Sequence, residues 1–423
     1  MNFLTFQIKE IKMKKLILSS LGFFLLLSFT ACDPTETIDI PTVTIIAPVA
    51  VAKTNTMKVY VHYMPWFENK TTNNGSWGYH WTMKNCNPDV IDSTGRRQIA
   101  SHYYPLIGPY ASSDKDLIEY HLLLMKYSGI DGILIDWYGQ WSYYDSKMIL
   151  INSNAIIAAC NKVGLEFAIV YEDRTIPGVL ALSSSTDSIS AAATDMSYVQ
   201  HTYFSKSNYI KIDNKPLLMV FGPDCIKKPA DWTEILSVFP IKPCFLSLYG
   251  FTPKVGTANS GGEYLWPWGD NISVDTKYQN ASNNKLPLFM GGAWPGFHDY
   301  YKEGGAGSTL FYEDYANGTK WDGMLAKATA NSVKYLQLVT WNDFGEGTMI
   351  EPTREFGYSY LTKLQSFVGA STDSVQLKNI YDMYTYRKQF RLDAVKQAKL
   401  DQAFYYFASM QDKKASEILN EVK

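Results

Sequence analysis

The chain has 423 residues, a formal net charge of −2 and a pI near 6.3, and this nearly balanced charge argues against a nucleic-acid or other polyanionic partner. Aromatic residues make up 15% of the sequence, so some of its 30 Tyr and 11 Trp are expected outside the core, where such rings contact sugar faces. The five cysteines include no C-x-x-C pair and no histidine at ligand spacing, which argues against a zinc site. Disulfides and buried free thiols both remain open.

Residues 1–31 have the pattern of a secretory signal, because lysines precede an apolar run over 16–29 that is short for a membrane-spanning helix. The sequence F-T-A-C at 29–32 is similar to a bacterial lipobox and predicts lipidation of Cys32. The alternative is an ordinary signal peptide with an incidental cysteine. We therefore expect a protein of the bacterial cell envelope, anchored by lipid in the outer membrane, on its surface or periplasmic face. Residues 32–54 show no amphipathic period, which predicts a flexible leash.

From residue 55 to 368, apolar strand-like runs alternate with helical segments. The eight predicted strands span 57–63, 131–137, 165–171, 216–221, 244–249, 263–268, 286–291 and 335–340. Apolar strands that alternate with helices are typical of an α/β fold, and eight of them predict a (β/α)8 TIM barrel, here with enlarged loops. No glycine-rich nucleotide motif follows the first strand, so a nucleotide cofactor is not indicated. Residues 369–423 are charged and amphipathic, which predicts a small helical appendage.

Acids and large aromatic residues follow several of the predicted strands, and the active site of such a barrel lies at those strand ends. The candidate substrate-binding residues of this kind are Tyr63, Trp66, Asp136, Trp137, Glu172, Trp268, Trp294, Trp341, Asn342 and Glu351. The long first loop adds His80 and Trp81 if it folds over the cleft, and a solvent-facing loop is the alternative. Asp136 could instead bond its neighbours, and Glu172 could form a plain ion pair with Arg174.

The stretch L-V-T-W-N-D-F-G-E-G-T-M-I-E-P at 338–352 is the most informative in the chain. It starts as a buried strand and then places Asp343 and Glu346 three residues apart, with Gly345 between them to permit a tight bend. Two carboxylates held close can serve as acid and base, because repulsion and partial burial keep one of them protonated. The alternative is a loop whose acids cap a helix or face water, and the neighbouring Trp341 and Asn342 favour a catalytic site.

The motif at 341–352 resembles the last-strand motif of glycoside hydrolase family 99, the endo-α-mannosidases and endo-α-mannanases. It is also similar to the W-N-D-Y-G-E segment of family 71, the α-1,3-glucanases. The sequences H-Y-M-P-W-F at 62–67 and D-G-I-L-I-D-W-Y at 131–138 resemble the first two strands of the family 99 group. The resemblance implies that Asp343 is the catalytic base and Glu346 the catalytic acid.

The same resemblance leaves the stereochemistry open. In family 99 the base deprotonates the sugar's own 2-hydroxyl, which attacks the anomeric carbon and leads to retention. Here the base position holds Asp343, as in family 71, whose members invert. An aspartate is one methylene group shorter than a glutamate, which leaves more room for a water molecule.

These features predict a glycoside hydrolase that cleaves an α-linked polysaccharide or oligosaccharide, α-mannan-like or α-glucan, without a cofactor or metal. The expected partners are this substrate, the membrane through Cys32, and other surface lipoproteins of glycan uptake. The main alternative is a catalytically inactive glycan-binding lipoprotein on the same barrel. A glycosyltransferase-associated barrel is a weaker alternative, because export separates the chain from nucleotide sugars. The two retained carboxylates favour the enzyme.

Overall fold

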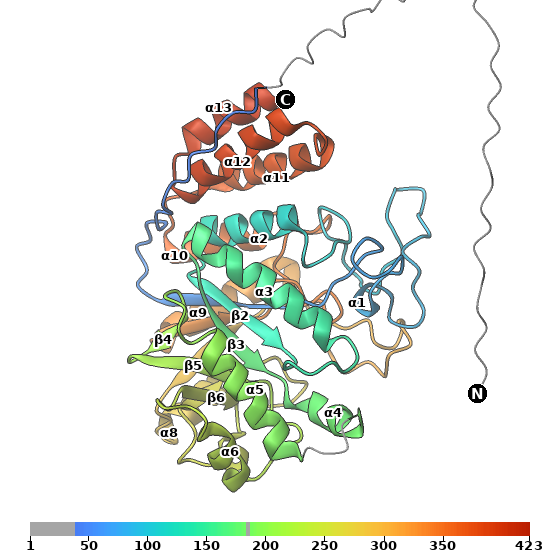
Figure 1. The fold of residues 1–423 in the computed structure, drawn as a ribbon. Helices are drawn as coiled ribbons and strands as arrows, with labels where there is room; N and C mark the ends of the chain where they lie inside the picture. The colour runs from blue at the N-terminus through green and yellow to red at the C-terminus, as the bar shows by residue number, and fades with distance from the viewer. Residues whose placement is uncertain (1–38, 183–186) are drawn as a thin grey trace, which may run out of the picture. The chain divides into compact units, whose positions relative to one another are not determined.

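The computed structural model describes residues 39–182 and 187–423, so the predicted signal segment and Cys32 lie outside the described residues. Eight strands form the core of the fold (Figure 1). They are β1 (Lys58–Tyr63), β2 (Gly132–Trp137), β3 (Glu166–Tyr171), β5 (Lys215–Val220), β6 (Cys244–Leu248), β7 (Gly262–Tyr264), β8 (Phe289–Ala293) and β11 (Tyr335–Leu338). Neighbouring strands are all parallel, and the pairings of β3 with β5 and of β11 with β1 close the sheet. The predicted (β/α)8 TIM barrel is confirmed.

Two strand boundaries differ from the prediction by three residues or more, and each of these differences lies next to a proline. The seventh predicted strand begins at Phe289 rather than at 286, and the sixth ends at Tyr264 rather than at 268. Pro287 and Pro267 lie in the parts that are not strand, and a proline has no N–H to donate to a sheet. The residues after β7 are therefore released from the sheet into the rim of the barrel.

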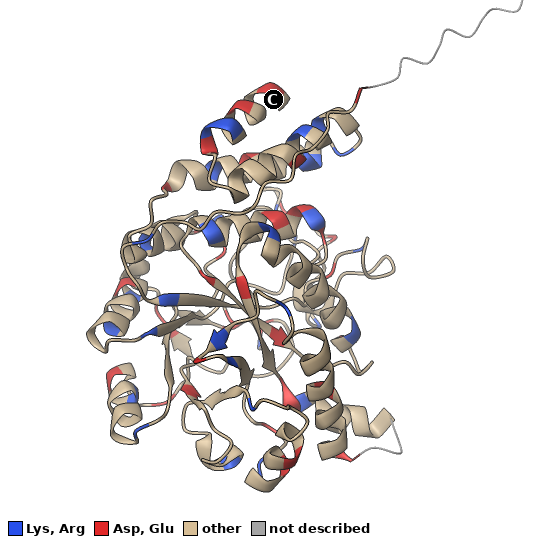
Figure 2. Cartoon of the chain, turned by 60° about the vertical axis from the view of Figure 1, so that its left-hand side comes forward, with Lys and Arg blue, Asp and Glu red and all other residues tan. Residues whose placement is uncertain are grey.

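Helices cover the outside of the barrel (Figure 1). The longer ones are α2 (Lys115–Tyr127), α3 (Ser146–Val163), α5 (Ser188–Thr202), α6 (Pro229–Leu236), α8 (Val274–Asn283), α9 (Thr319–Ala330) and α10 (Ser359–Val368). The short elements are α1 (Tyr79–Thr82), α4 (Ile176–Leu182), α7 (Thr252–Val255), β4 (Lys211–Ile212), β9 (Phe297–His298) and β10 (Tyr312–Glu313). Figure 2 shows acidic and basic residues interspersed over the helices in that view, in keeping with the net charge of −2.

Three helices follow the barrel: α11 (Ser374–Gln389), α12 (Ala394–Ala408) and α13 (Asp412–Val422). A buried ion-pair network joins two of them, α11 and α12, to the barrel helix α2. Arg387 of α11 is 1% exposed, and its guanidinium lies 2.7 Å from Glu119 of α2 and 2.9 Å from Asp401 of α12. A buried charge is tolerated only when it is paired in this way. The helices are therefore packed against the barrel through specific contacts.

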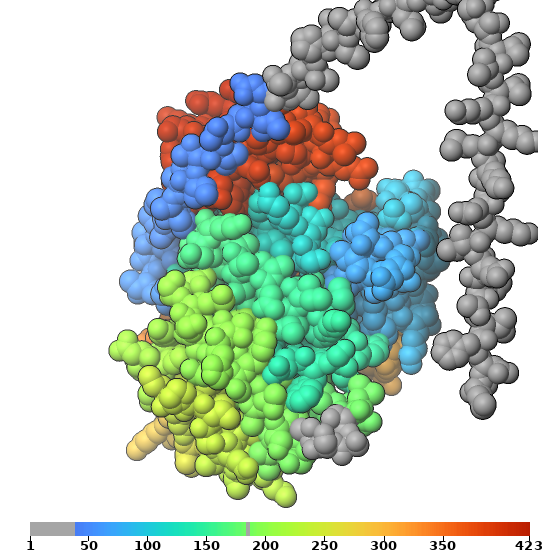
Figure 3. All heavy atoms as spheres, in the orientation of Figure 1, coloured from blue at the N-terminus to red at the C-terminus, as the bar shows by residue number. Residues whose placement is uncertain are grey.

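Residues 44–54 correct the expectation of a flexible leash. They form no helix or continuous strand, yet Thr44 N donates to Gln402 Oε1 at 2.7 Å and Val49 N to the carbonyl of Ala408 at 3.1 Å. Figure 3 shows this first described segment, in blue, lying across the C-terminal helices, in red. The extended backbone is held because α12 and neighbouring segments of the barrel satisfy several of its polar groups, a tertiary effect that composition does not reveal.

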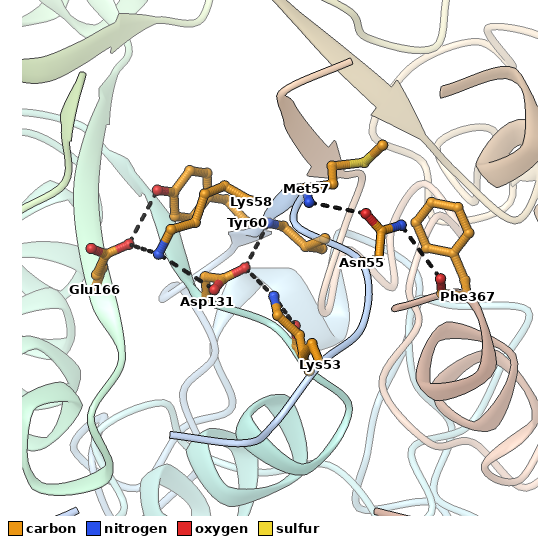
Figure 4. A network of polar contacts seen from close by, with 10 residues as sticks. Lys53, Asn55, Met57, Lys58, Tyr60, Asp131, Glu166 and Phe367 are labelled. Carbon is orange, nitrogen blue, oxygen red and sulfur yellow. Dashed lines mark hydrogen bonds and ion pairs between the residues drawn. The ribbon is translucent and has the colours of Figure 1, made fainter. Parts of the chain in front are cut away.

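A polar network fixes the N-terminal ends of the first three strands (Figure 4). Asp131, just before β2, accepts hydrogen bonds from Lys53 at 2.6 Å and from the amide of Val59 at 2.8 Å. Glu166, the first residue of β3, accepts from the hydroxyl of Tyr60 at 3.1 Å, and Lys58 lies 3.4 Å from both acids. This end of a barrel contributes stability, whereas the opposite end carries the chemistry.

Two further findings bear on the predicted location and redox state. Within residues 39–182 and 187–423, no helix combines the length and the apolar character that crossing a bilayer requires. The four cysteines in this part of the chain, Cys86, Cys160, Cys225 and Cys244, are free thiols.

Candidate active site

The loop that follows β11 presents the two candidate catalytic carboxylates. Its two ends are joined by a hydrogen bond from Thr340 N to the carbonyl of Thr348 at 2.9 Å, and the hydroxyl of Thr340 accepts from Asp343 N at 2.8 Å. The left-handed conformation that the bend needs lies at Gly347, with φ +71°, and not at Gly345 as predicted. A side chain at Gly347 would also collide with His298 O, 2.8 Å from an ideal Cβ.

Asp343 and Glu346 are held together by this loop. Asp343 is 3% exposed, and its Oδ1 accepts a hydrogen bond from Glu346 N at 2.9 Å. Oε1 of Glu346 accepts from the hydroxyl of Tyr301 at 3.0 Å. In the described part of the chain, Oε2 of Glu346 is buried without a hydrogen-bond partner. Each carboxylate is thus fixed through one oxygen.

Burial raises the pKa of both carboxylates, but by different amounts. For Asp343 burial raises the pKa to about 6, against the lowering effects of the Glu346 amide and of the His80 charge. For Glu346 burial raises the pKa to about 8, assisted by the negative charge of Asp343 and opposed by the Tyr301 hydrogen bond. Near pH 7 Asp343 is then mainly ionised and Glu346 mainly protonated, which is how a base and an acid are set apart.

A second acidic cluster lies at the ends of β2 and β3. Asp136 is 1% exposed, and burial, followed by the charge of Glu172, raises its pKa well above the ordinary value. Both oxygens of Asp136 lack a hydrogen-bond partner among the described residues. Arg174 donates to both carboxylate oxygens of Glu172, at 2.8 Å for Nη2 to Oε1, so the expected alternative of an ion pair is what forms. The side chain of Asp136 nevertheless lies within hydrogen-bonding reach of Glu172, so the alternative that it bonds a neighbour stays open.

Helix α1 brings one of the two predicted flap residues to the site. The ring of His80 stacks on Trp66 with centroids 4.1 Å apart, and its Nε2 lies 3.1 Å from Asp145 Oδ2. Its charge also acts on Asp343, which places it on the same side of the barrel. Trp81 does not reach the site, because it is 0% exposed and donates to the carbonyl of Tyr110 at 2.8 Å. The prediction for Trp81 is therefore wrong.

A cleft of about 480 Å³ opens beside Glu346. Its polar lining includes Arg174 and Tyr301, and its aromatic lining includes Trp266 and Trp268, which follow β7. Trp268 is 42% exposed. A concave, mainly apolar surface with a few convergent polar groups is the usual form of a ligand site.

Comparisons with known proteins agree with this geometry. No protein-family model matches the sequence. The glycoprotein endo-alpha-1,2-mannosidase-like proteins of Danio rerio and Homo sapiens are 22% and 21% identical to it over 280 and 276 residues. These matches cover 60% of this chain and 60% and 58% of those proteins, so the chain spans about 60% of the length of its curated relatives.

Solved structures give the same relationship. The family 99 endo-alpha-mannosidase of Bacteroides thetaiotaomicron superposes with a TM-score of 0.57 at 20% identity, over 77% of this chain and 98% of that one. A glycoside hydrolase-like protein superposes with a TM-score of 0.55 at 13% identity, over 76% and 97%. The chain has the fold of glycoside hydrolase family 99. The predicted resemblance to family 99 is confirmed at the level of the fold.

Three predicted substrate-binding residues of this family 99 fold point away from the cleft. Tyr63, Trp137 and Trp341 are all 0% exposed. Tyr63 Oη lies 3.2 Å from His121 Nδ1, Trp137 stacks on Tyr198 with centroids 5.9 Å apart, and Trp341 packs edge-on against His121 at 5.4 Å. Side chains alternate along a strand, so the residue next to an inward one faces the outer helices. The prediction that these residues contact substrate is corrected.

Asn342 and Glu351 support the loop rather than line the cleft. Asn342 is 0% exposed, accepts from Met64 N at 2.8 Å and donates to Met64 O at 3.0 Å. Glu351 is 1% exposed, accepts from the Tyr110 hydroxyl at 2.7 Å and lies 3.3 Å from His121 Nε2. Their bonds fix the catalytic loop to the first strand and to α2. The prediction of direct substrate contact is wrong for both.

Trp294 is also buried, at 3% exposure, and its indole N–H donates to Glu313. The prediction that Trp294 contacts substrate is therefore wrong, because protein atoms enclose its ring. Of the other predicted binding residues, Trp268 lines the cleft and Trp66 stacks on His80. Asp136 and Glu172 are buried at the ends of β2 and β3, and their contact with substrate stays a prediction. No group of three or more His, Cys, Asp or Glu side chains in the described ranges is placed to hold a metal ion.

Tyr301 is the site residue that sequence reasoning missed. It lies between β9 and β10, in a loop without hydrophobic periodicity. The loop reaches the site because His298 N donates to Glu346 O at 2.9 Å and Tyr300 N to Gly345 O at 2.8 Å. This pairing between distant segments has no local sequence signal.

Proposed function

We propose that this protein is a glycoside hydrolase acting on α-linked mannose glycans, with Asp343 as the base and Glu346 as the acid. The observation that carries the proposal is the pair of carboxyl groups on one loop, where Glu346 N donates to Asp343 Oδ1 at 2.9 Å. Burial raises the pKa of both, to about 6 for Asp343 and about 8 for Glu346, which supports one base and one acid. The similarity to an endo-alpha-mannosidase and to endo-alpha-1,2-mannosidase-like proteins supports mannose as the sugar.

The proposed reaction transfers protons through both carboxyl groups. Glu346 donates its proton to the glycosidic oxygen as the bond from that oxygen to the anomeric carbon breaks. Asp343 takes a proton from the attacking oxygen, which belongs either to the sugar's 2-hydroxyl or to a water molecule. Attack by the 2-hydroxyl gives a 1,2-anhydro sugar, which water then opens with net retention. Direct attack by water gives inversion. In the two-step route each carboxyl group transfers a proton in both directions, because Glu346 takes a proton from the water that opens the intermediate and Asp343 returns one to the 2-oxygen. In direct attack by water each group acts once.

The surrounding groups have roles that fit this scheme. The Tyr301 hydroxyl, 3.0 Å from Glu346 Oε1, holds the acid in place. The carboxyl group of Asp136 and the Glu172–Arg174 ion pair can form hydrogen bonds with sugar hydroxyls. Burial favours the neutral form of Asp136, which can both donate and accept a hydrogen bond. Trp66, whose ring stacks on His80, offers an aromatic surface to the sugar.

The decisive experiment is product analysis with the full-length protein. Incubation with α-mannan and with α-1,3-glucan, followed by proton NMR of the first anomer formed, tests sugar class and stereochemistry together. We expect new reducing ends from α-mannan. The double variant Asp343→Asn, Glu346→Gln is the control for contaminating activity. Release from glucan alone would move the assignment to α-glucan, and binding of mannan without release would favour a glycan-binding protein.

A further inference from the structure

A cavity of about 890 Å³ lies at the N-terminal ends of the barrel strands. Its walls are the β4–β5 hairpin, helix α8 and the loops that lead into β6, β7, β8 and β11. Figure 1 shows two of these elements, β4 and α8, at the left. The candidate catalytic loop follows β11, so it lies at the opposite end of the barrel. A ligand in this cavity would therefore be bound away from Asp343 and Glu346.

The cavity adjoins a second one of about 380 Å³, because residues 332–335 line both of them. The smaller cavity extends along residues 55–58, which lie beside the polar network of Figure 4. Ligand sites in proteins usually enclose about 300–1,000 Å³. The two adjoining cavities, which we call the N-terminal groove, are therefore large enough for a saccharide and are not limited to a single ion.

The lining of the larger cavity carries more positive than negative charge. Three lysines from different segments line it: Lys215, Lys242 and Lys334. Among its described lining residues only Asp213 is acidic. No ion pair in the described part of the chain includes any of the three lysines. Because the whole chain has a net charge of −2, the excess of positive charge is local to this cavity.

The contacts of two lysines place their charges at the cavity wall. The Lys242 ammonium donates to the carbonyl of Ala258, a neutral group that also lines the cavity. Burial raises the pKa of the Cys244 thiol to about 11, and the Lys215 charge opposes this effect, so Lys215 lies near Cys244. The charge of Asp213 acts on the same thiol. One carboxylate thus accompanies three ammonium groups, and positive charge remains uncompensated.

The rest of the lining suits a sugar. Exposed amide and hydroxyl side chains can bond sugar hydroxyls, and they belong to Gln279, Ser282, Asn283, Asn331 and Ser332. Tyr335 lines both cavities and is only partly buried. An aromatic ring with a polar tip at a wet surface can pack against the face of a sugar.

These features together define the ligand. Ammonium groups bind phosphate and carboxylate groups as point charges, whereas a neutral sugar would leave the lysines without a partner. We propose that the N-terminal groove is a second, non-catalytic binding site for an anionic saccharide, a sugar that carries a phosphate or a carboxylate group. This inference does not rest on the proposed function, because the groove lies at the opposite end of the barrel from the catalytic pair.

The test is calorimetric titration of the full-length protein with mannose 6-phosphate, glucuronic acid, mannose and inorganic phosphate at low salt. We expect one of the two anionic sugars to bind at least about tenfold more tightly than both mannose and inorganic phosphate, since a few exposed charge contacts together are worth that ratio. The tighter of the two distinguishes a phosphate from a carboxylate. Salt at about 1 M should remove most of this preference, because it screens charges beyond about 3 Å.

The combined variant Lys215→Gln, Lys242→Gln, Lys334→Gln should lower the affinity for the anionic sugar at least about tenfold. The matched control carries Lys162→Gln, Lys206→Gln and Lys413→Gln, three exposed lysines outside both cavities, and should bind like the wild type. Thermal unfolding of both variants confirms that they are folded.

Three outcomes would overturn the inference. The anionic sugars could bind no more tightly than mannose, or not at all. Inorganic phosphate could bind as tightly as mannose 6-phosphate, which would indicate an adventitious ion only. The variant of Lys215, Lys242 and Lys334 could keep the preference, which would place the anion elsewhere, for example at Arg174. Hydrolysis is measured separately, so absence of turnover refutes the proposed function and leaves this test unaffected.

Discussion

The amide nitrogen of Glu346 donates a 2.9 Å hydrogen bond to Oδ1 of Asp343. The backbone of the acid residue thus stabilises the charge of the base residue, and the charge of Asp343 in turn raises the pKa of Glu346. The two residues are therefore not interchangeable, although both are carboxyl groups on one loop. This asymmetry supports the assignment of Asp343 as base and Glu346 as acid.

The first prediction concerns this pair. Asp343→Asn and Glu346→Gln should each lower the hydrolysis rate of α-mannan by at least about two orders of magnitude, because general acid–base catalysis contributes roughly 10²–10⁴. A glycosyl fluoride needs no proton on its leaving group, so it should partly rescue the Glu346→Gln variant and not the Asp343→Asn variant. Initial rates on both substrates test the assignment.

A matched control uses a second pair with the same spacing. Asp231 and Glu234 lie three residues apart on the surface helix α6, so Asp231→Asn and Glu234→Gln should leave the rate unchanged. Wild-type rates for Asp343→Asn and Glu346→Gln would make the loop structural. The catalytic pair would then have to be sought at Asp136 and Glu172.

The second prediction separates two tryptophans that the sequence placed in one group. Trp66→Ala should weaken oligosaccharide binding by about 1 kcal/mol, since its ring lies at the rim on His80. Trp137→Ala should destabilise the fold by about 3–5 kcal/mol, because the ring is 0% exposed between β2 and α5. Calorimetric titration and denaturant unfolding measure the two effects. If Trp66→Ala and Trp137→Ala lowered the free energy of unfolding equally, the assignment of Trp66 to binding and of Trp137 to the core would be wrong.

The barrel could be predicted from the sequence because parallel strands are buried on both faces and appear as apolar runs. Because such a run is apolar throughout, the sequence does not show which of its side chains face the inside of the barrel. Tyr63 and Trp137 were placed in the cleft although they lie next to the inward-facing His62 and Asp136, and an apolar run shows no alternation to separate them. The catalytic loop could be found because its carboxylates are close in sequence and match a known motif.

The remaining site residues depend on long-range contacts. Tyr301 reaches Glu346 across 45 positions of sequence, and its loop is held by backbone bonds that any residue could make. Residues 44–54 were expected to be flexible because local composition does not record their docking on α12. These features required the three-dimensional structure.

The third prediction concerns location. From the sequence F-T-A-C at 29–32 we propose that Cys32 is lipidated and anchors the protein to the bacterial outer membrane. Cys32→Ala should then release the protein into the soluble fraction without altering its activity. Fractionation after a salt wash, with immunoblotting, measures the distribution. A variant that still sediments with membranes would show that another segment attaches the protein.

The fourth prediction concerns the network in Figure 4. Asp131→Ala should lower the free energy of unfolding by about 1–3 kcal/mol, because Lys53 and the Val59 amide, 2.6 and 2.8 Å from it, lose their partner in a largely buried place. Asp89→Ala is the control, since the Asp89–Lys70 pair is well exposed and should contribute little. Denaturant unfolding compares them, and equal losses would mean that burial of the network is unimportant.

The last prediction is the pH dependence of catalysis. The base must be ionised, so activity should fall as the pH drops through about 6, where Asp343 takes up a proton. The acid must be protonated, so activity should also fall as the pH rises through about 8, where Glu346 loses its proton. The profile of kcat/KM should be bell-shaped, with limbs that belong to the coupled pair.

Two variants test which residue is responsible for the alkaline limb of the pH profile. On a glycosyl fluoride, Glu346→Gln should remove the alkaline limb, because no proton donor is then required. Tyr301→Phe should move that limb to higher pH, because it removes a hydrogen bond that lowers the Glu346 pKa. A structural role for Tyr301 alone would reduce the rate at every pH without moving the limb. Limbs at the ordinary carboxyl values near 4 in the wild-type protein would show that burial does not set the acid and base apart, and the assignment of this pair would have to be abandoned.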